Sequence, residues 1–195
     1  MKGKAFFDFD GTLVKFDSFI KFAWHSLSPC LFVKGVIMSL PWLSGWKLRM
    51  CSGSIAKERL FYNWFKGWDL TDFNMKCKEF VPIIDAGIKN DIMAELASHQ
   101  NAHHEIIIVS ASLANWIEPW AILHSIDRVI ATEPEVTEDR KLTGKFRTPN
   151  CLGIEKVKRI LRIYPDLKEY ESWAYSDSDK DSPLLAEVSH GFKVK

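Results

Sequence analysis

The chain has 195 residues, 47% of them hydrophobic, and a formal net charge of +1 at pH 7. This length suits one domain carrying a sizeable insert, and the composition excludes a disordered chain. The near-neutral charge gives no electrostatic basis for a nucleic-acid partner, so none is expected. The cysteines have no metal-like spacing, and the N-terminal segment lacks a signal-peptide pattern, so we expect a cytoplasmic protein.

The first predicted element is a buried strand over residues 4–9 that ends on two carboxylates. The strand is apolar and β-prone, and Gly11 ends it. Asp8 and Asp10 stand at its end, inside an aromatic run. A carboxylate is costly to desolvate unless something pairs with it, so this pair demands a partner.

Residues 15–87 differ in composition from the rest of the chain. They hold 14 of the 25 aromatic residues, with ten Lys and Arg against six Asp and Glu. Apolar stripes at helical spacing predict helices over 16–27 and 60–68, with Asp17 or Ser18 as the N-cap of the first. This stretch is therefore a helical insertion after the first strand.

From residue 88 onward, predicted helices and strands alternate. Strands are expected over 105–109, 128–132 and 172–175, helices over 88–98, 113–124, 154–164 and 183–188, a hairpin over 136–146, and a last strand from 192 that suggests a natural chain continuing beyond Lys195. The histidines show no metal spacing, and His99, His103 and His104 are expected in a solvated loop. The alternation predicts an α/β fold: a Rossmann-like parallel sheet with helices on both faces and an inserted all-α cap.

Polar residues follow the predicted strands at the points where ligands bind in parallel sheets. They are Asp8 and Asp10 after the first strand, Ser110 and Ser112 after the second, and Asp177 and Asp181 after the strand at 172–175. Crowded carboxylates repel one another, so a hard divalent cation is the expected resident. Mg²⁺ fits best because it uses one or two protein carboxylates and leaves its other positions to water and phosphate.

Together these motifs resemble the haloacid dehalogenase superfamily of phosphohydrolases. The first motif is DFDGTL at 8–13, the second VSAS at 109–112, the third Lys156 in NCLGIEKV, and the fourth YSDSDKD at 175–181. The helical insertion resembles the type-1 cap of the phosphoserine-phosphatase-like branch. Within that branch, the motifs look closest to phosphatidylglycerophosphatase C-like proteins.

The resemblance implies a division of the chain and a fold. Residues 1–14 and 88–195 would form the catalytic core, and residues 15–87 the helical type-1 cap. The activity that it implies is a Mg²⁺-dependent phosphomonoester phosphatase working through an aspartyl-phosphate. Asp8 would be the nucleophile, and Asp10 would protonate the leaving oxygen and then deprotonate the hydrolytic water.

The resemblance also implies the remaining site roles. The metal site would consist of Asp8, Asp10 through its carbonyl, Asp177 and Asp181, with Asp181 orienting a metal-bound water or the third-motif lysine. Ser110 and Lys156 would bind the phosphoryl oxygens, with backbone N–H groups of the turn through Gly11 as further donors. The fourth motif departs from the branch, because Lys180 stands where that branch often has asparagine.

Structural alternatives exist for three of these residues. Lys156 could be a solvated charge on its helix, since Lys158 and Arg159 follow it. Ser110 could cap the helix after its strand, and Asp181 could cap the helix that starts at Pro183.

The substrate depends on what the insertion does. In one interpretation, the apolar residues of the insertion form the buried core of the cap, and the protein is a soluble phosphatase for a small metabolite such as phosphoserine. The other is a cap in peripheral contact with the cytoplasmic face of a membrane, with a lipid or amphipathic phosphomonoester as substrate. A membrane span over 22–46 is not expected, because Pro29, Gly35 and Pro41 would interrupt its helix and a single crossing would separate Asp8 from Ser110. A catalytically silent lipid- or partner-binding relative is the third alternative.

Overall fold

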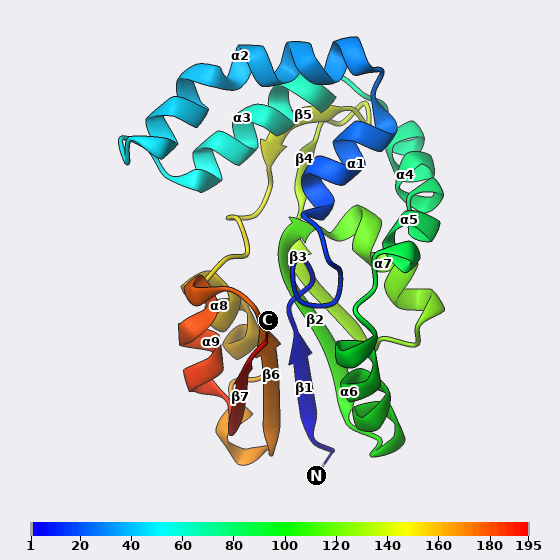
Figure 1. Cartoon of the computed structure of the whole chain (residues 1–195), viewed down its shortest axis with the longest axis vertical. Helices are drawn as coiled ribbons and strands as arrows, with labels where there is room; N and C mark the ends of the chain where they lie inside the picture. Colours follow the sequence, from blue (N-terminus) through cyan, green and yellow to red (C-terminus); the bar gives the residue numbers. More distant parts are fainter. Residues whose placement is uncertain (1, 195) are drawn as a thin grey trace.

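Within residues 2–194, which the computed structural model describes, five parallel strands form the central sheet in the order β3–β2–β1–β6–β7 (Figure 1). The strands are β1 (Lys4–Phe7), β2 (Glu105–Leu113), β3 (Arg128–Thr132), β6 (Ser172–Ser176) and β7 (His190–Lys193). The predicted α/β fold is confirmed. The proposed continuation of the chain beyond Lys195 lies outside the described residues.

Alternate side chains of the strands enter two separate hydrophobic cores. Phe7 of β1 packs in one core with Ile108 of β2, whereas Phe6 packs in the other with Ile107. This alternation is the period-2 geometry of a strand, and it explains why β1 and the first half of β2 are apolar throughout: both faces of the sheet are covered.

Helices cover the two faces of the sheet (Figure 1). The helices α6 (Asn90–Asn101) and α7 (Ala114–Leu123) contribute Leu96 and Trp120 to the core on the Phe7 side. On the Phe6 side lie α8 (Ile154–Ile163) and α9 (Ser182–Glu187). The carboxyl ends of β1, β2 and β6 therefore point toward the same end of the molecule, beneath the insertion.

The insertion forms a layer of helices over that end of the sheet. Its helices are α1 (Ser18–Ser26), α2 (Pro29–Lys47), α3 (Gly53–Phe65), α4 (Leu70–Glu79) and α5 (Val81–Ala86). Asp17 caps α1, as the sequence predicts, because its Oδ1 accepts a hydrogen bond from Ile20 N at 3.1 Å. Phe22 of α1 stacks on Trp116 of α7 with ring centroids 4.7 Å apart, which ties the insertion to the core.

A hairpin from the second half of the chain joins this layer. It consists of β4 (Pro134–Val136) and β5 (Leu142–Phe146), close to the predicted 136–146. The N–H of Phe146 donates to Glu58 of α3 at 3.0 Å, and the ring of Phe146 packs on Phe61. The segment 88–195 therefore also contributes to the packing of the insertion.

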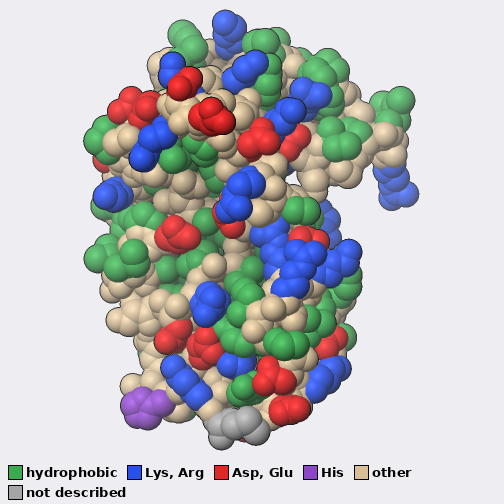
Figure 2. Space-filling view, turned by 180° about the vertical axis from the view of Figure 1, so that it is seen from behind, with side chains coloured by type: hydrophobic (Ala, Val, Ile, Leu, Met, Phe, Trp, Pro, Cys, Tyr) green, Lys and Arg blue, Asp and Glu red, His purple; other side chains and the backbone are tan. Residues whose placement is uncertain are grey.

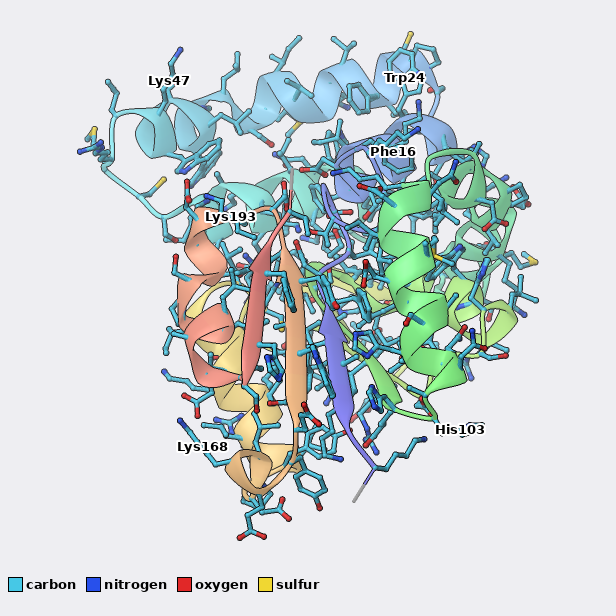
Figure 3. All side chains as sticks on the ribbon, turned by 60° about the horizontal axis from the view of Figure 1, so that its bottom comes forward. Phe16, Trp24, Lys47, His103, Lys168 and Lys193 are labelled. Carbon is cyan, nitrogen blue, oxygen red and sulfur yellow. The ribbon has the colours of Figure 1, made fainter. Side chains whose placement is uncertain are left out.

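The helix α2 runs unbroken through the residues that were expected to interrupt it. Pro29 occupies its first turn, where a missing N–H costs nothing. Pro41 lies inside the helix, and Gly35 is buried against α3. α2 lies on the side of the insertion away from the sheet, with Lys47 at its last residue and Trp24 of α1 beside its first turns (Figure 3). Seen from behind, the end of α2 and α3 projects beyond the core (Figure 2).

The expectation of a solvated histidine loop is wrong for His99. This side chain belongs to the last turn of α6 and is only 7% exposed. Its Nε2 lies 3.0 Å from the hydroxyl of Tyr175, and its Nδ1 lies 2.8 Å from Nδ1 of His104. The buried environment comes from β6, more than 70 residues later in the chain, so the local sequence carries no sign of it.

None of the helices in residues 2–194 is both long enough and apolar enough to cross a bilayer.

Candidate active site

A tight turn after β1 brings Asp8 to the carboxyl end of the sheet. The N–H of Asp8 donates to the carbonyl of Tyr175 at 3.0 Å, so the strand pairing with β6 continues to this residue. The chain then turns at Gly11, which has φ 74°. A Cβ on Gly11 would lie 2.3 Å from Oδ2 of Asp177, so only glycine fits between the two loops.

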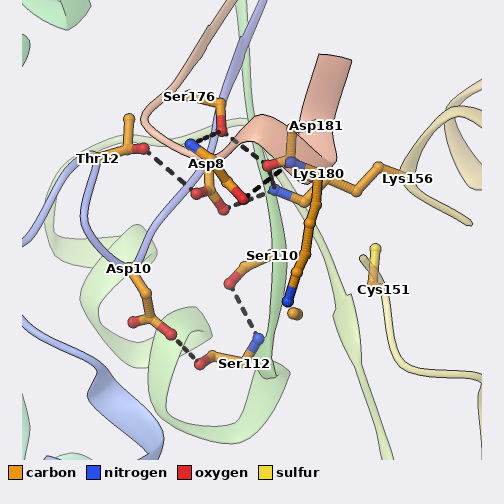
Figure 4. A network of polar contacts seen from close by, with 12 residues as sticks. Asp8, Asp10, Thr12, Ser110, Ser112, Cys151, Lys156, Ser176, Lys180 and Asp181 are labelled. Atoms are coloured by element: carbon orange, nitrogen blue, oxygen red, sulfur yellow. Dashed lines mark hydrogen bonds and ion pairs between the residues drawn. The ribbon is translucent and has the colours of Figure 1, made fainter. Parts of the chain in front are cut away.

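Lys156 forms a buried ion-pair triad with Asp8 and Asp181 (Figure 4). Its Nζ lies 2.6 Å from Oδ1 of Asp8 and 2.7 Å from Oδ2 of Asp181, and the lysine is 1% exposed. The three residues come from the loop after β1, the first turn of α8 and the segment after β6. The alternative of a solvated surface lysine is therefore wrong.

Asp181 has both carboxylate oxygens engaged within the protein. Oδ2 accepts from Lys156 and from Ser176 Oγ at 2.8 Å, while Oδ1 accepts from the N–H of Gly153 at 3.2 Å. Its side chain makes no capping bond to α9, so the alternative of a helix cap is wrong. These bonds fix the orientation of the carboxylate that faces Lys156.

Thr12 links Asp8 to the third loop of the site. Its hydroxyl lies 3.3 Å from Oδ2 of Asp8 and 3.1 Å from Oδ1 of Asp177, and it accepts the N–H of Asp177 at 3.0 Å. One hydroxyl has a single proton, so it can donate to only one of the two carboxylates at a time. Asp8 and Asp177 therefore lie close enough to share one small partner.

Asp10 belongs to a second polar group, next to the first. Its Oδ1 accepts the N–H of Ser18 at 3.0 Å, and its Oδ2 accepts the hydroxyl of Ser112. The hydroxyl of Ser18 donates to Ser112 at 3.0 Å and accepts from Trp116 Nε1 at 3.0 Å. The carboxylate of Asp10 is thus held between the start of α1 and the end of β2.

The strand β2 is longer than predicted, and Ser110 and Ser112 lie inside it rather than after it. Its pairing with β3 shifts register between Ser110, which faces Ala131, and Leu113, which faces Thr132. Irregularities of this kind commonly re-aim side chains beside active sites. Ser110 accepts the N–H of Ser112 at 3.0 Å and makes no cap on α7, so the capping alternative is wrong (Figure 4).

Burial and charge together set the protonation of the site. Burial raises the pKa of Asp8, and the ammonium group of Lys156 opposes that rise. Burial alone would lower the pKa of Lys156, but the two carboxylates outweigh it and hold the pKa above its usual range. Burial, helped by repulsion from Asp17, raises the pKa of Asp10 to about 6 against the attraction of Lys57.

Lys57 is a site residue that the sequence did not reveal. It lies in the first half of α3, where Glu58 and Arg59 make it resemble a solvated charge. Its Nζ instead donates to the carbonyl of Ala111 in β2 at 3.0 Å. Burial lowers its pKa, while attraction to Asp10, Asp17 and Asp8 opposes that effect. The insertion therefore delivers a cation to the edge of the site.

The structure brings every sequence-predicted site residue to the carboxyl end of the sheet. Hydrogen bonds join them in two groups. The first contains Asp8, Lys156, Asp181 and Asp177, connected through Thr12 and Ser176. The second contains Asp10 and Ser110, connected through Ser112, and Gly11 packs against Asp177. Thr12 stands in the same turn as Asp8, so its position in the first motif was an available signal. No sequence signal pointed to the contacts of Ser18 with Asp10 and Ser112.

The carboxyl end of the sheet offers oxygen donors suited to a small hard cation. In residues 2–194, no three or more Asp, Glu, His or Cys side chains cluster as a metal site by themselves. Mg²⁺ does not require such a cage, because it is usually bound through one or two carboxylates plus water and phosphate. Asp8 and Asp177, linked by one hydroxyl, fit that smaller donor set.

A scan against family models gives the class of this fold and site. The haloacid dehalogenase-like hydrolase model matches residues 5–186. The chain therefore belongs to the haloacid dehalogenase-like hydrolase family.

Curated relatives are distant. The inhibition of morphological differentiation protein of Streptomyces azureus is 30% identical over 138 residues, 66% of this chain; the match spans about half of that relative, 47% of its length. A probable phosphatase of Mycobacterium tuberculosis is 26% identical over 199 residues, with 97% of this chain and 68% of that protein covered.

Solved structures share the fold across nearly the whole chain. A protein of unknown function from Bordetella pertussis has a TM-score of 0.77 at 21% identity, covering 97% of this chain and 88% of that one. A phosphoserine phosphatase in its apo form has a TM-score of 0.65 at 14% identity, covering 99% and 85%. At these identities, the likeness establishes the fold.

Proposed function

We propose that the protein is a Mg²⁺-dependent phosphomonoester phosphatase that works through an aspartyl-phosphate on Asp8. The observation that carries this proposal is the buried triad of Asp8, Lys156 and Asp181 at the carboxyl end of the sheet. The hydroxyl of Thr12 lies within hydrogen-bond distance of both Asp8 and Asp177. A buried carboxylate held against a lysine is a positioned, ionised nucleophile. Membership in a hydrolase family and similarity to phosphatases support the same chemistry.

The proposed reaction has two steps at one phosphorus atom. In the first, a carboxylate oxygen of Asp8 attacks phosphorus, and the bond from phosphorus to the leaving oxygen breaks. Asp10 gives its proton to that oxygen, so the product leaves as an alcohol. In the second, Asp10 takes a proton from water as the water attacks the phosphorus, which restores the Asp8 carboxylate and releases inorganic phosphate.

Fixed donors would stabilise the charge on the phosphoryl oxygens. Lys156 supplies an ammonium group already next to Asp8, and Ser110 supplies a buried hydroxyl from β2. Backbone N–H groups in the turn through Gly11 would add further donors. Such transfers depend on positioning and charge stabilisation more than on covalent help from the protein.

Asp8, the carbonyl of Asp10 and Asp177 are the residues that would hold Mg²⁺. When bound, the ion would neutralise the charge that gathers on the phosphoryl group. Asp181 was grouped with these ligands from the sequence. Because its oxygens are engaged by Lys156, Ser176 and Gly153, we assign it instead to orienting Lys156.

We propose an amphipathic or lipid phosphomonoester as the substrate class. The insertion that covers the site is aromatic and basic, and it places Lys57 beside the reacting carboxylates. A soluble phosphatase for a small metabolite such as phosphoserine is the alternative, since phosphoserine phosphatases share the fold. A catalytically silent binding protein would have no use for the Asp8 and Asp10 pair.

The test is hydrolysis of p-nitrophenyl phosphate with Mg²⁺ and with excess chelator. Activity should require Mg²⁺ and should fall by at least a thousandfold in Asp8→Asn. Asp179→Asn is the matched control, because Asp179 lies in the same motif segment but is exposed to solvent. Turnover that is equal in Asp8→Asn and Asp179→Asn would reject Asp8 as the nucleophile. A panel with phosphatidylglycerophosphate and phosphoserine would then choose between the substrate classes.

A further inference from the structure

The helix α2 exposes large apolar side chains that a surface helix normally buries. A surface helix normally buries its large apolar residues and exposes polar ones. The fully buried residues of α2 are instead the small Gly35 and Ser39. Phe32, Val36 and Leu43 are partly buried against the core, but other large apolar side chains of α2 face outward, and the usual pattern does not explain why those residues are apolar.

Close packing on α3 accounts for the small residues. A Cβ at Gly35 would lie 2.2 Å from Cδ1 of Trp64, so glycine is what allows that ring to approach. Trp64 Nε1 donates to the carbonyl of Phe32 at 3.0 Å, and Asn63 donates to Ser39 Oγ at 2.9 Å. These contacts lie on the inner face of α2, and the exposed outer face takes no part in them.

The outer face of α2 is apolar along the length of the helix. It is made of Leu31, Val33, Ile37, Met38, Leu40 and Leu48, each about half exposed or more. The half-exposed ring of Trp24, at the end of α1, packs on Phe32 of α2 at 5.1 Å between centroids (Figure 3). The half-exposed ring of Trp46, in the last turn of α2, lies against Gly53 of α3 instead. Contiguous exposed apolar surface of this kind marks an interaction site.

The charge around this face has one sign. Residues 18–56 contain four basic residues and no Asp or Glu; the basic residues are Lys21, Lys34, Lys47 and Arg49. Lys34 lies on the exposed side of α2, and Lys47 and Arg49 lie at its exposed end, where Figure 2 shows apolar and basic side chains together on the projecting tip. An apolar face bordered by cations complements an anionic, apolar partner.

We propose that the outer face of α2 docks on the surface of an anionic lipid bilayer. The apolar side chains would enter the boundary between headgroups and acyl chains, Trp24 would lie at headgroup level, and Lys34 and Lys47 would meet anionic headgroups. A second copy of the chain fits less well. A symmetric contact of α2 with α2 would bring the same basic residues of both copies together, with no acidic residue in 18–56 to balance them.

A pocket of about 600 Å³ lies between the α2–α3 turn and the core. Arg49 and Met50 line it from the turn, and Leu152 and Lys180 line it from the core, next to the residues that hold Lys156. The substrate class proposed above depends on the catalytic proposal, whereas the docking itself does not.

The test is flotation of the full chain with vesicles of phosphatidylcholine, alone or mixed with phosphatidylglycerol. Binding should require the anionic lipid and weaken as salt rises. Ile37→Gln/Met38→Gln should weaken binding to the mixed vesicles at least tenfold, which corresponds to about 1.4 kcal/mol. Ile122→Gln/Leu123→Gln is the matched control: an adjacent apolar pair on α7, 77% and 70% exposed, which should bind as the unaltered chain does.

Separate readouts distinguish docking from catalysis. Asp8→Asn should bind vesicles normally, and Ile37→Gln/Met38→Gln should hydrolyse soluble p-nitrophenyl phosphate at the normal rate. The proposal is overturned if the chain does not float with anionic vesicles, or if both apolar pairs matter equally. It is also overturned if the chain is a dimer in solution that Ile37→Gln/Met38→Gln converts to a monomer.

Discussion

Replacing Lys156 by methionine is the sharpest test of how the site is built. The substitution keeps the length and most of the volume of the side chain but removes its charge. Asp8 and Asp181 then face each other without the ammonium group that now lies 2.6 and 2.7 Å from them. Neither carboxylate is more than 9% exposed, so water cannot replace the lost partner.

The expected loss follows from that burial. Removing one partner of a buried ion pair typically costs about 3–5 kcal/mol, because a charge is left uncompensated. Lys156 serves two carboxylates, so we expect Lys156→Met to lower the free energy of unfolding by at least that amount. Asp181→Asn added to Lys156→Met should restore part of the loss, with a coupling energy of about 0.5–3 kcal/mol between the two substitutions.

Urea denaturation followed by circular dichroism, with chelator present, measures these changes. Lys158→Met is the matched control, because Lys158 lies two residues further along α8 and is exposed. Its stability should stay within about 0.5 kcal/mol of the unaltered chain. If Lys156→Met and Lys158→Met unfold at the same urea concentration, the buried triad does not exist in solution and the reasoning fails.

Three further substitutions test other parts of the structure. Gly153→Ala should lower the free energy of unfolding by about 1–3 kcal/mol, because φ is 58° at this residue and a Cβ would lie 2.9 Å from the carbonyl oxygen of Lys180. An unchanged melting temperature would contradict this prediction. Burial, with repulsion from His104, lowers the pKa of His99 from 6.5 to about 4, so the folded state resists a proton that the unfolded state accepts. His99 should therefore contribute a loss of about 2–3 kcal/mol of stability as the pH drops from 6.5 toward 4. The difference in stability between the unaltered chain and His99→Asn, followed in denaturation curves across this pH range, measures that contribution. Lys57→Met should lower kcat/KM at least tenfold, because it removes a cation beside the reacting carboxylates. Lys57→Arg keeps the charge and should retain more activity. Equal kcat/KM values in the two variants would exclude a charge effect.

The convergence of the site loops could be predicted because it follows from strand periodicity. An apolar run of strand length followed by Asp8 and Asp10, and a second run followed by Ser110, place these side chains at one end of a parallel sheet. Lys156 could be assigned only through the family resemblance. Its own helix carries other cations, and nothing local marks it as the buried one.

The features that the sequence did not disclose depend on contacts between distant segments. His99 is buried by β6, and Lys57 reaches β2 only because α3 is folded over the sheet. The extra residues of β2 around Ser110 arise from its pairing with β3, which no local propensity encodes. Pro41 was expected to break a helix, but α2 packs along α3 and continues past it.

Trapping the phosphorylated enzyme tests the central claim most directly. The full chain is mixed with Mg²⁺ and a phosphomonoester, quenched in acid during turnover, digested and examined by mass spectrometry. One phosphoryl group should be found on the peptide that contains Asp8, and it should be absent from Asp8→Asn. A phosphoryl group on another residue, or efficient turnover with no phosphorylated peptide at any quench time, would contradict the account.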